Sequence, residues 1–281
     1  MKIGFVGQGW IGKHYADDFE TRGYNVVRYA LEEAYVGNKE KIAMCDIVFV
    51  AVPTPTNETG FNDSYVRDAL TTVGKGKSVV IKSTIVPGTT QSLQEAFPDL
   101  FVFHSPEFLV EKTAAYDAAH PNRNIVGIPK DTEEYHKRAE EILSVLAPAP
   151  YEKIMSARDA EFVKYAGNCF LFTKVIFMNL LYDLVEKSGG NWSDIKSAFI
   201  HDPRIGISHT EPTHQGGRGA GGDCFIKDFE AFRRMYDEFV GDEFGKAILA
   251  NEAYKNIQLL AASRKDVELL QGVYGDISHY Q

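Results

Sequence analysis

Gly7, Gly9 and Gly12 form a G-x-G-x-x-G turn near the start of the chain. The apolar run Lys2–Val6 before it is predicted to be a buried strand, and Gly12–Arg22 is predicted to be the helix that follows. In this setting Gly7 permits a tight turn, Gly9 lets the backbone approach a ligand, and Gly12 lets the helix pack close to the strand. Free N–H groups at the helix N-terminus favour a phosphate. The turn therefore predicts a dinucleotide-binding strand–turn–helix unit.

Further apolar runs alternate with helical patterns through the first half of the chain. The predicted strands are Asn25–Tyr29, Asp46–Val52, Ser78–Lys82, Phe101–His104 and Asn124–Ile128. Continuous apolar strands separated by helices indicate a parallel sheet covered on both faces. The predicted fold class is α/β, with a Rossmann-like doubly wound parallel sheet whose ligands bind at the carboxyl ends of the strands.

The pattern changes after Pro148 and Pro150, which mark a domain boundary. Residues 1–150 are predicted to be the dinucleotide-binding domain, and residues 151–281 an all-helical central domain for substrate binding and dimerisation. Its predicted helices are Asp159–Lys187, Ser193–Ile200 and a helical region over 228–264, with a glycine-rich loop over 201–223. Because the first of these helices is apolar over much of its length, we expect a homodimer.

Composition narrows the function classes. The net charge of −9 disfavours nucleic acid as a partner. No run of about 18 apolar residues is found, so no membrane span is expected. Three cysteines without paired spacing argue against a disulfide framework and a metal site, and the expected location is the cytoplasm. Cys45 and Cys169 lie in apolar segments and are expected to be buried.

Several further stretches carry a family resemblance. They are Asp46–Thr56, Lys82–Thr90, Ser105–Leu109, Lys164–Asn168 and the run GGDCFIKD at Gly221–Asp228. Together and in this order they resemble the nucleotide-sugar dehydrogenases of the UDP-glucose 6-dehydrogenase type, over nearly the whole chain. Members usually continue into a third α/β domain that closes over the nucleotide, whereas this sequence ends at Gln281. Residues 201–219 could replace its contacts, a separate chain could supply it, or the substrate could be smaller.

The resemblance implies NAD-dependent oxidation of the primary alcohol of a nucleotide sugar to a carboxylate. A cysteine holds the aldehyde as a thiohemiacetal and then a thioester, a base activates water, and a cation or amide stabilises the oxyanion. The implied catalytic residues are the nucleophile Cys224, the oxyanion-stabilising Lys164 with its partner Asn168, the base Glu107, and Thr84 and Asp228, which hold the water.

Binding residues follow from the same resemblance and from the glycine turn. The cofactor is expected to contact Gly7, Gly9, Trp10, Ile11, Gly12, Tyr29, Ala30, Val52, Pro53, Thr54, Thr56, Ser83, Thr84 and Lys227. The substrate is expected to contact Glu107, Phe108, Leu109, Glu111, Lys164, Asn168, Arg204 and Gly221. In the family an arginine like Arg204 reaches the sugar nucleotide from a neighbouring subunit.

Three points stay open at the level of sequence. Ala30 stands where an acid normally binds the adenosine ribose, so Arg28 could favour NADP, whereas Glu32 or Glu33 could serve NAD, the expected cofactor. Glu161 could pair with Lys164 one helical turn away. The alternatives to a four-electron dehydrogenase are a two-electron β-hydroxyacid dehydrogenase and a cofactor-binding homologue without turnover.

Overall fold

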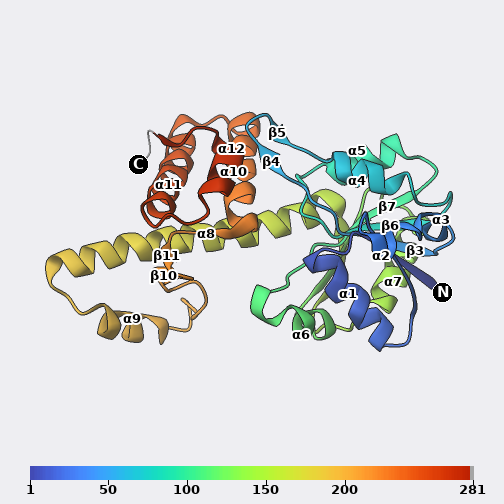
Figure 1. Ribbon diagram of the computed structural model, residues 1–281, viewed down its shortest axis with the longest axis horizontal. Helices are drawn as coiled ribbons and strands as arrows, with labels where there is room; N and C mark the ends of the chain where they lie inside the picture. The colour runs from blue at the N-terminus through green and yellow to red at the C-terminus, as the bar shows by residue number, and fades with distance from the viewer. Residues whose placement is uncertain (279–281) are drawn as a thin grey trace. The chain divides into compact units, whose positions relative to one another are not determined.

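The computed structural model describes residues 1–278, apart from the side chain of Asp223. Its contacts divide the chain into two compact units. The first comprises Met1–Pro55 and Asn62–Lys164, and the second comprises Thr56–Phe61 and the chain from Tyr165 onward. Figure 1 shows the elements of both units.

The first unit is built on a seven-stranded sheet in the order β2-β1-β3-β6-β7-β8-β9. Its strands are β1 (Lys2–Val6), β2 (Asn25–Tyr29), β3 (Ile47–Val50), β6 (Ser78–Ile81), β7 (Phe101–His104), β8 (Asn124–Ile128) and β9 (Glu152–Ser156). Pairing is parallel from β2 through β7. The doubly wound α/β prediction is confirmed, because helices lie on both faces of this sheet (Figure 1).

The helices of the first unit supply the cover for the sheet. They are α1 (Trp10–Thr21), α2 (Glu33–Val36), α3 (Lys39–Ile42), α4 (Ser64–Leu70), α5 (Thr89–Ala96), η1 (Glu111–Thr113), α6 (Ala114–Ala119) and α7 (Glu133–Val145). Side chains of α1, α6 and α7 share one core cluster with the inward side chains of the strands. Phe5, Phe19 and Phe49 lie at its centre, with ring centroids 5.1 to 5.3 Å apart.

The sheet is mixed rather than parallel throughout. β8 runs antiparallel to β7, and β9 then pairs in parallel with β8. The connection from β7 to β8 holds only η1 and α6, and the chain re-enters the sheet in the opposite direction. β9 is an edge strand with exposed residues such as Glu152 and Lys153, and its polar sequence hid it from strand prediction. It lies beyond residue 150, and the first compact unit extends to Lys164.

The second unit is mainly helical. Its elements are the hairpin β4 (Thr56–Asn57) and β5 (Gly60–Phe61), α8 (Ala157–Ser188, which starts in the first unit), α9 (Trp192–Ile200), β10 (Thr213–His214), β11 (Gly217–Arg218), α10 (Gly222–Phe239), α11 (Glu243–Ala262) and α12 (Val267–Tyr274). The region predicted as helical over 228–264 is two helices, because Gly241 has a φ of 66° and the Asp242 side chain caps α11. α10 begins at Gly222, so Cys224 lies in a helix rather than next to a loop.

Helix α8 is long and apolar. Against the expectation of no membrane-spanning segment, an 18-residue window of α8 has a mean hydropathy of 1.4, and its length and composition suffice to cross a membrane. This is weak evidence, since core helices of soluble proteins pass the same test. Within the second unit, Lys174 of α8 donates to the carbonyls of Ile205, Gly206 and Ser208. The helix therefore anchors the loop that follows α9.

Candidate functional site

The glycine turn lies between β1 and α1. Gly7 has a φ of 91°, and a Cβ there would collide with the carbonyl oxygen of Ala51. A Cβ at Gly12 would collide with the carbonyl oxygen of Gly7. Both positions therefore require glycine for the packing of the chain itself.

Gly9 differs from its two neighbours. A Cβ at Gly9 would meet no heavy atom within 4 Å, yet Gly9 is the N-cap of α1 and provides no side chain to cap it. The first turn of α1 also carries no acidic residue. Open space beside uncapped N–H groups is what a pyrophosphate needs. The turn fits a dinucleotide.

The end of β2 favours NAD over NADP. Ala30 is buried and has no polar side-chain atom. The Arg28 guanidinium, which could have bound a 2′-phosphate, forms ion pairs with Asp17 and Glu20, each at 2.7 Å. These carboxylates already neutralise Arg28, whereas Glu32 at the start of α2 is exposed.

Several residues expected to form a wall of the cofactor site are joined by hydrogen bonds where β3 and β6 end. Ser83 Oγ accepts from the Val52 amide at 2.9 Å and donates to the Val52 carbonyl at 2.7 Å. Thr54 Oγ1 donates to the Thr84 carbonyl at 2.6 Å, and both threonines are buried. Thr56, expected in the same wall, begins β4 and belongs to the second unit.

Lys164 and Glu107 form a buried ion pair in the first unit. Lys164 Nζ lies 2.5 Å from Glu107 Oε1 and also donates to the Glu107 carbonyl at 2.9 Å. Glu107 Oε2 accepts from the Leu109 amide at 2.8 Å. The two predicted catalytic residues are therefore in direct contact, and each holds the other in a fixed position.

Glu161 has a different role from the one considered at the level of sequence. It does not pair with Lys164, and its carboxylate accepts hydrogen bonds from the amides of Gly88 and Thr90 and from Thr90 Oγ1. Gly88 is the N-cap of α5, so Glu161 satisfies the N-terminus of that helix. The pKa of Glu161 is raised by burial, which these hydrogen bonds partly oppose.

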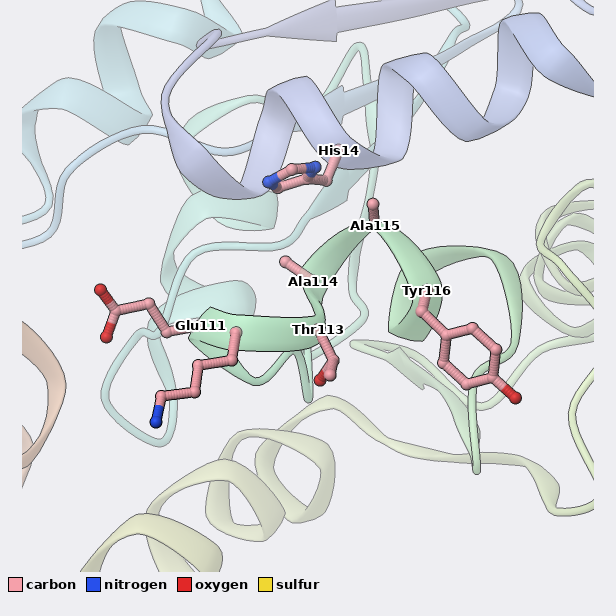
Figure 2. Close-up of a pocket in the computed structure, with 7 residues that line it drawn as sticks. His14, Glu111, Thr113, Ala114, Ala115 and Tyr116 are labelled. Carbon is pink, nitrogen blue, oxygen red and sulfur yellow. The ribbon is translucent and has the colours of Figure 1, made fainter.

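The expected substrate residues after Glu107 continue along the same segment. The Arg123 guanidinium lies 3.8 Å from the centre of the Phe108 ring. Glu111 lines a pocket of about 340 Å³ together with His14 and residues 112–116. Figure 2 shows the His14 ring on the side of α1 that faces η1 and α6. The pocket is a surface feature of the first unit.

In the second unit, Asp228 joins two other predicted residues. Its Oδ2 accepts from Asn168 Nδ2 at 2.6 Å, and its Oδ1 lies 2.5 Å from Lys227 Nζ. Asp228 is 1% exposed. Asn168 is therefore held by Asp228, whereas Lys164, the partner expected for Asn168, is held by Glu107.

The three cysteines differ in environment. Cys45 and Cys169 are buried, as expected, and burial raises the pKa of both thiols. Cys224 is exposed in the first turn of α10. A helix N-terminus carries a partial positive charge, which favours a thiolate. Cys224 is the cysteine with the access and the setting that a nucleophile needs.

Two further predicted residues lie around the 201–221 segment. Gly221 is the N-cap of α10. Arg204 is exposed, and its guanidinium pairs with Asp202 at 2.5 Å. Arg218, considered as a substitute contact for a third domain, instead donates to Asn179 and pairs with Asp183 of α8.

Sequence reasoning missed two buried polar residues at the carboxyl ends of β6 and β7. Lys82 and His104 are 3% and 0% exposed and end the strand patterns of β6 and β7. Polar residues directly after apolar strands stand at the carboxyl edge of the sheet, where ligands bind. The place of Lys82 and His104 at the ends of apolar strands was the signal in the sequence that could have identified them as site residues.

Comparison with known proteins identifies the family. Two models of the UDP-glucose/GDP-mannose dehydrogenase family match the chain, the NAD binding domain over residues 33–146 and the central domain over residues 158–251. The chain belongs to this family. The glycine turn precedes the matched part of the NAD binding domain, and α8 begins one residue before the central domain.

Individual relatives agree. UDP-glucose 6-dehydrogenase of Rickettsia conorii is 35% identical over 204 residues, which are 68% of this chain and 45% of that protein. The enzyme of the same name from Streptococcus pneumoniae is 27% identical over 91% of this chain and 74% of its own length. A UDP-glucose dehydrogenase structure from Pyrobaculum islandicum has a TM-score of 0.77 at 27% identity, covering 95% of this chain and 71% of that one. The chain spans about half the length of the first curated relatives it matches.

Proposed function

We propose that the protein oxidises the primary alcohol of a nucleotide sugar to a carboxylate with NAD, in the cytoplasm. The observation that carries this proposal is the exposed Cys224 in the first turn of α10, while the other two cysteines are buried. Family membership supports the reaction class. The open space beside the uncapped N–H groups at Gly9 and the ion-paired Arg28 support NAD as the cofactor.

The proposed reaction has three stages. The alcohol carbon first loses a hydride and the hydroxyl loses a proton, which leaves an aldehyde. The Cys224 thiol adds to the aldehyde carbon as a thiohemiacetal, and loss of a second hydride from this carbon and of the proton from its hydroxyl leaves a thioester. Water then attacks the thioester carbon, which releases the carboxylate and returns the thiol. NAD accepts each hydride, so two molecules are reduced per sugar.

The remaining catalytic roles are proposed as follows. Lys164 has three N–H groups, two of which donate to Glu107, and the third can stabilise the oxyanion. Glu107 accepts a proton from the attacking water. Asp228 fixes the Asn168 amide, which shares the oxyanion role. Thr84 orients the water.

Binding roles and domain roles are part of the same proposal. The cofactor contacts are assigned to the glycine turn and to the hydrogen-bonded residues that follow β3 and β6. Lys227 of α10 is assigned a further cofactor contact. The sugar nucleotide contacts are assigned to Phe108, Leu109, Glu111 and Gly221. Residues 1–150 act as the dinucleotide-binding domain, and residues 151–281 bind substrate and dimerise.

A homodimer is also proposed. Phe170, Phe177 and Leu184 of α8 are spaced by seven residues, and their exposed fractions are 68%, 52% and 66%. Side chains at this spacing share one face of a helix. Exposed apolar side chains gathered on one face are typical of an association surface. Arg204, which is exposed, is proposed to contact the substrate of the neighbouring subunit.

The test is a count of NADH formed per sugar consumed. UDP- and GDP-sugars and free sugars are supplied singly with NAD or NADP, and the product is identified by mass. We expect two NADH and a carboxylate from a nucleotide sugar, and loss of the acid in Cys224→Ser. Cys45→Ala, which removes a buried thiol, serves as the matched control and keeps the two-to-one ratio.

Each other outcome identifies an alternative. One NADH per substrate, with Cys224→Ser fully active, indicates a two-electron dehydrogenase of the β-hydroxyacid type. Cofactor binding without turnover of any substrate tested indicates a binding homologue. Either result refutes the four-electron reaction.

A further inference from the structure

Lys82 is a buried lysine of the first unit at the end of β6. Its side chain follows β6 and is 3% exposed. Its Nζ donates to Ser105 Oγ at 3.0 Å and lies 4.4 Å from the centre of the Tyr15 ring. Within residues 1–278 the structure gives Lys82 no direct ion pair. A hydroxyl and an aromatic face are therefore the groups that hold this amino group.

Ser105 connects Lys82 to the proposed base. It is 1% exposed, and its amide donates to the Ile81 carbonyl at 2.9 Å, which fixes the start of the segment that carries Glu107. Glu107 follows two residues later. The amino group of Lys82 thus holds the start of the segment that carries Glu107, whose carboxylate contacts Lys164.

The protonation of Lys82 is sensitive to pH near neutrality. Burial lowers the pKa of Lys82 to about 7, the charge of Glu107 opposes this shift, and the charge of Lys164 adds to it. Lys82 therefore interacts with both members of the pair. Its own charge is present below about pH 7 and absent well above it.

Two other titratable groups around Lys82, His104 and Tyr15, do not change charge in this range. Burial lowers the pKa of His104 to about 3, so the imidazole is neutral. Burial raises the pKa of Tyr15 far above its ordinary value, so the phenol is neutral. Near Tyr15, Asp18 pairs with Arg22 at 2.7 Å, and Asp117 accepts from the Val110 amide at 2.9 Å.

We propose that Lys82 is a positioning residue for the reaction proposed above. Its ammonium charge compensates part of the Glu107 carboxylate charge, which leaves Lys164 free to stabilise the substrate oxyanion. With Lys82 protonated, its charge repels that of Lys164 and a second cation compensates the Glu107 carboxylate, so Lys164 is held less tightly. With Lys82 neutral, Lys164 alone compensates Glu107 and stays bound to it. Where stabilisation of the oxyanion limits turnover, the protonated form of Lys82 is therefore the faster form.

The first experiment compares turnover of the full chain with its nucleotide sugar and NAD between pH 6 and 9. The ratio of kcat between the parent and Lys82→Met is expected to be about tenfold at pH 6 and to fall to about one at pH 9, the size expected of one charge at several ångströms. KM for NAD stays unchanged. Lys82→Arg stays charged, so its kcat relative to Lys82→Met stays constant with pH. Lys77→Met, on the same strand segment, is the control and shows a ratio of about one throughout.

The second experiment needs no turnover and uses the midpoint of urea unfolding. The pKa of Lys82 is lower in the folded protein than its ordinary value of 10.5, so the buried ammonium destabilises the fold fully below pH 7 and this effect disappears as the pH approaches 10.5. Lys82→Met therefore raises the midpoint most at pH 6. In a Glu107→Gln background this rise is larger, because the attraction between Lys82 and Glu107 is gone.

The two experiments separate this inference from the proposed function. If no sugar is oxidised by the parent, the proposed reaction fails, and the coupling between Lys82 and Glu107 in urea decides whether Lys82 acts on the pair. Equal midpoint changes in both backgrounds overturn the inference. A turnover ratio that does not vary with pH overturns it as well, even if the midpoint changes are as expected.

Discussion

Removal of one partner of the Lys164–Glu107 pair is expected to destabilise the protein strongly, whereas removal of both is not. At the observed 2.5 Å separation, the attraction between two unit charges at an effective dielectric constant of about 20 is about 7 kcal/mol. Both side chains are almost fully buried, at 9% and 4% exposure. Desolvation costs several kcal/mol per ion, so the net contribution of the intact pair is small.

The single variants leave a buried charge without compensation. We expect Lys164→Met to lower the free energy of unfolding by about 3–5 kcal/mol, and Glu107→Gln to lower it in the same direction. The double variant is expected to lie within about 1 kcal/mol of the parent, because the amide oxygen introduced by Glu107→Gln can still accept from the Leu109 amide and neither charge of the pair remains. A loss of this size in the single variant is a large part of the stability of a typical domain.

The measurement is urea unfolding at constant pH, followed by circular dichroism, for the parent, both single variants and the double variant. Lys13→Met removes the exposed Lys13–Asp17 pair and is the control, with an expected change of about 1 kcal/mol or less. A double variant that loses the sum of the two single effects would refute the reasoning, because the pair would then not act as a unit.

Two more predictions concern the cofactor turn and the helical unit. Gly12→Ala should lower the free energy of unfolding by about 1–3 kcal/mol, since its Cβ collides with backbone. Gly9→Ala should leave the melting temperature unchanged and still weaken NADH binding measured by fluorescence. Binding of NADH by Gly9→Ala at the parent affinity would contradict the placement of the pyrophosphate at Gly9. Phe177→Glu should shift the protein from dimer to monomer in sedimentation equilibrium, with Lys187→Glu as a charge control on the same helix; a parent protein that is already monomeric would rule out the proposed α8 surface.

Local sequence was enough for much of the fold. The strands of the first unit except β9 were predicted nearly to the residue, because a buried strand is continuously apolar. Helix α8 was predicted within two residues at its start and one at its end, where Gly189 has a φ of 77°. The edge strand β9 was missed because half-exposed polar residues carry no such signal.

The residues of the candidate site were named from sequence motifs, but their partners were not. Glu161 and Lys164 are one helical turn apart and looked like a pair, yet Glu161 caps α5 and Lys164 binds Glu107, 57 residues earlier. Spacing along a helix shows which side chains can meet, but not which of several neighbours wins. That choice depends on the distances and the burial that packing creates.

The sequence by itself determined the glycine turn, because the backbone conformation at Gly7 and the close approach at Gly12 are local demands that only glycine meets. Only the tertiary structure decided the electrostatics around Glu107. Charges interact through space, so the state of Lys82 follows from its burial between β6, β7 and α1 and from the charges of Glu107 and Lys164, which no local pattern encodes.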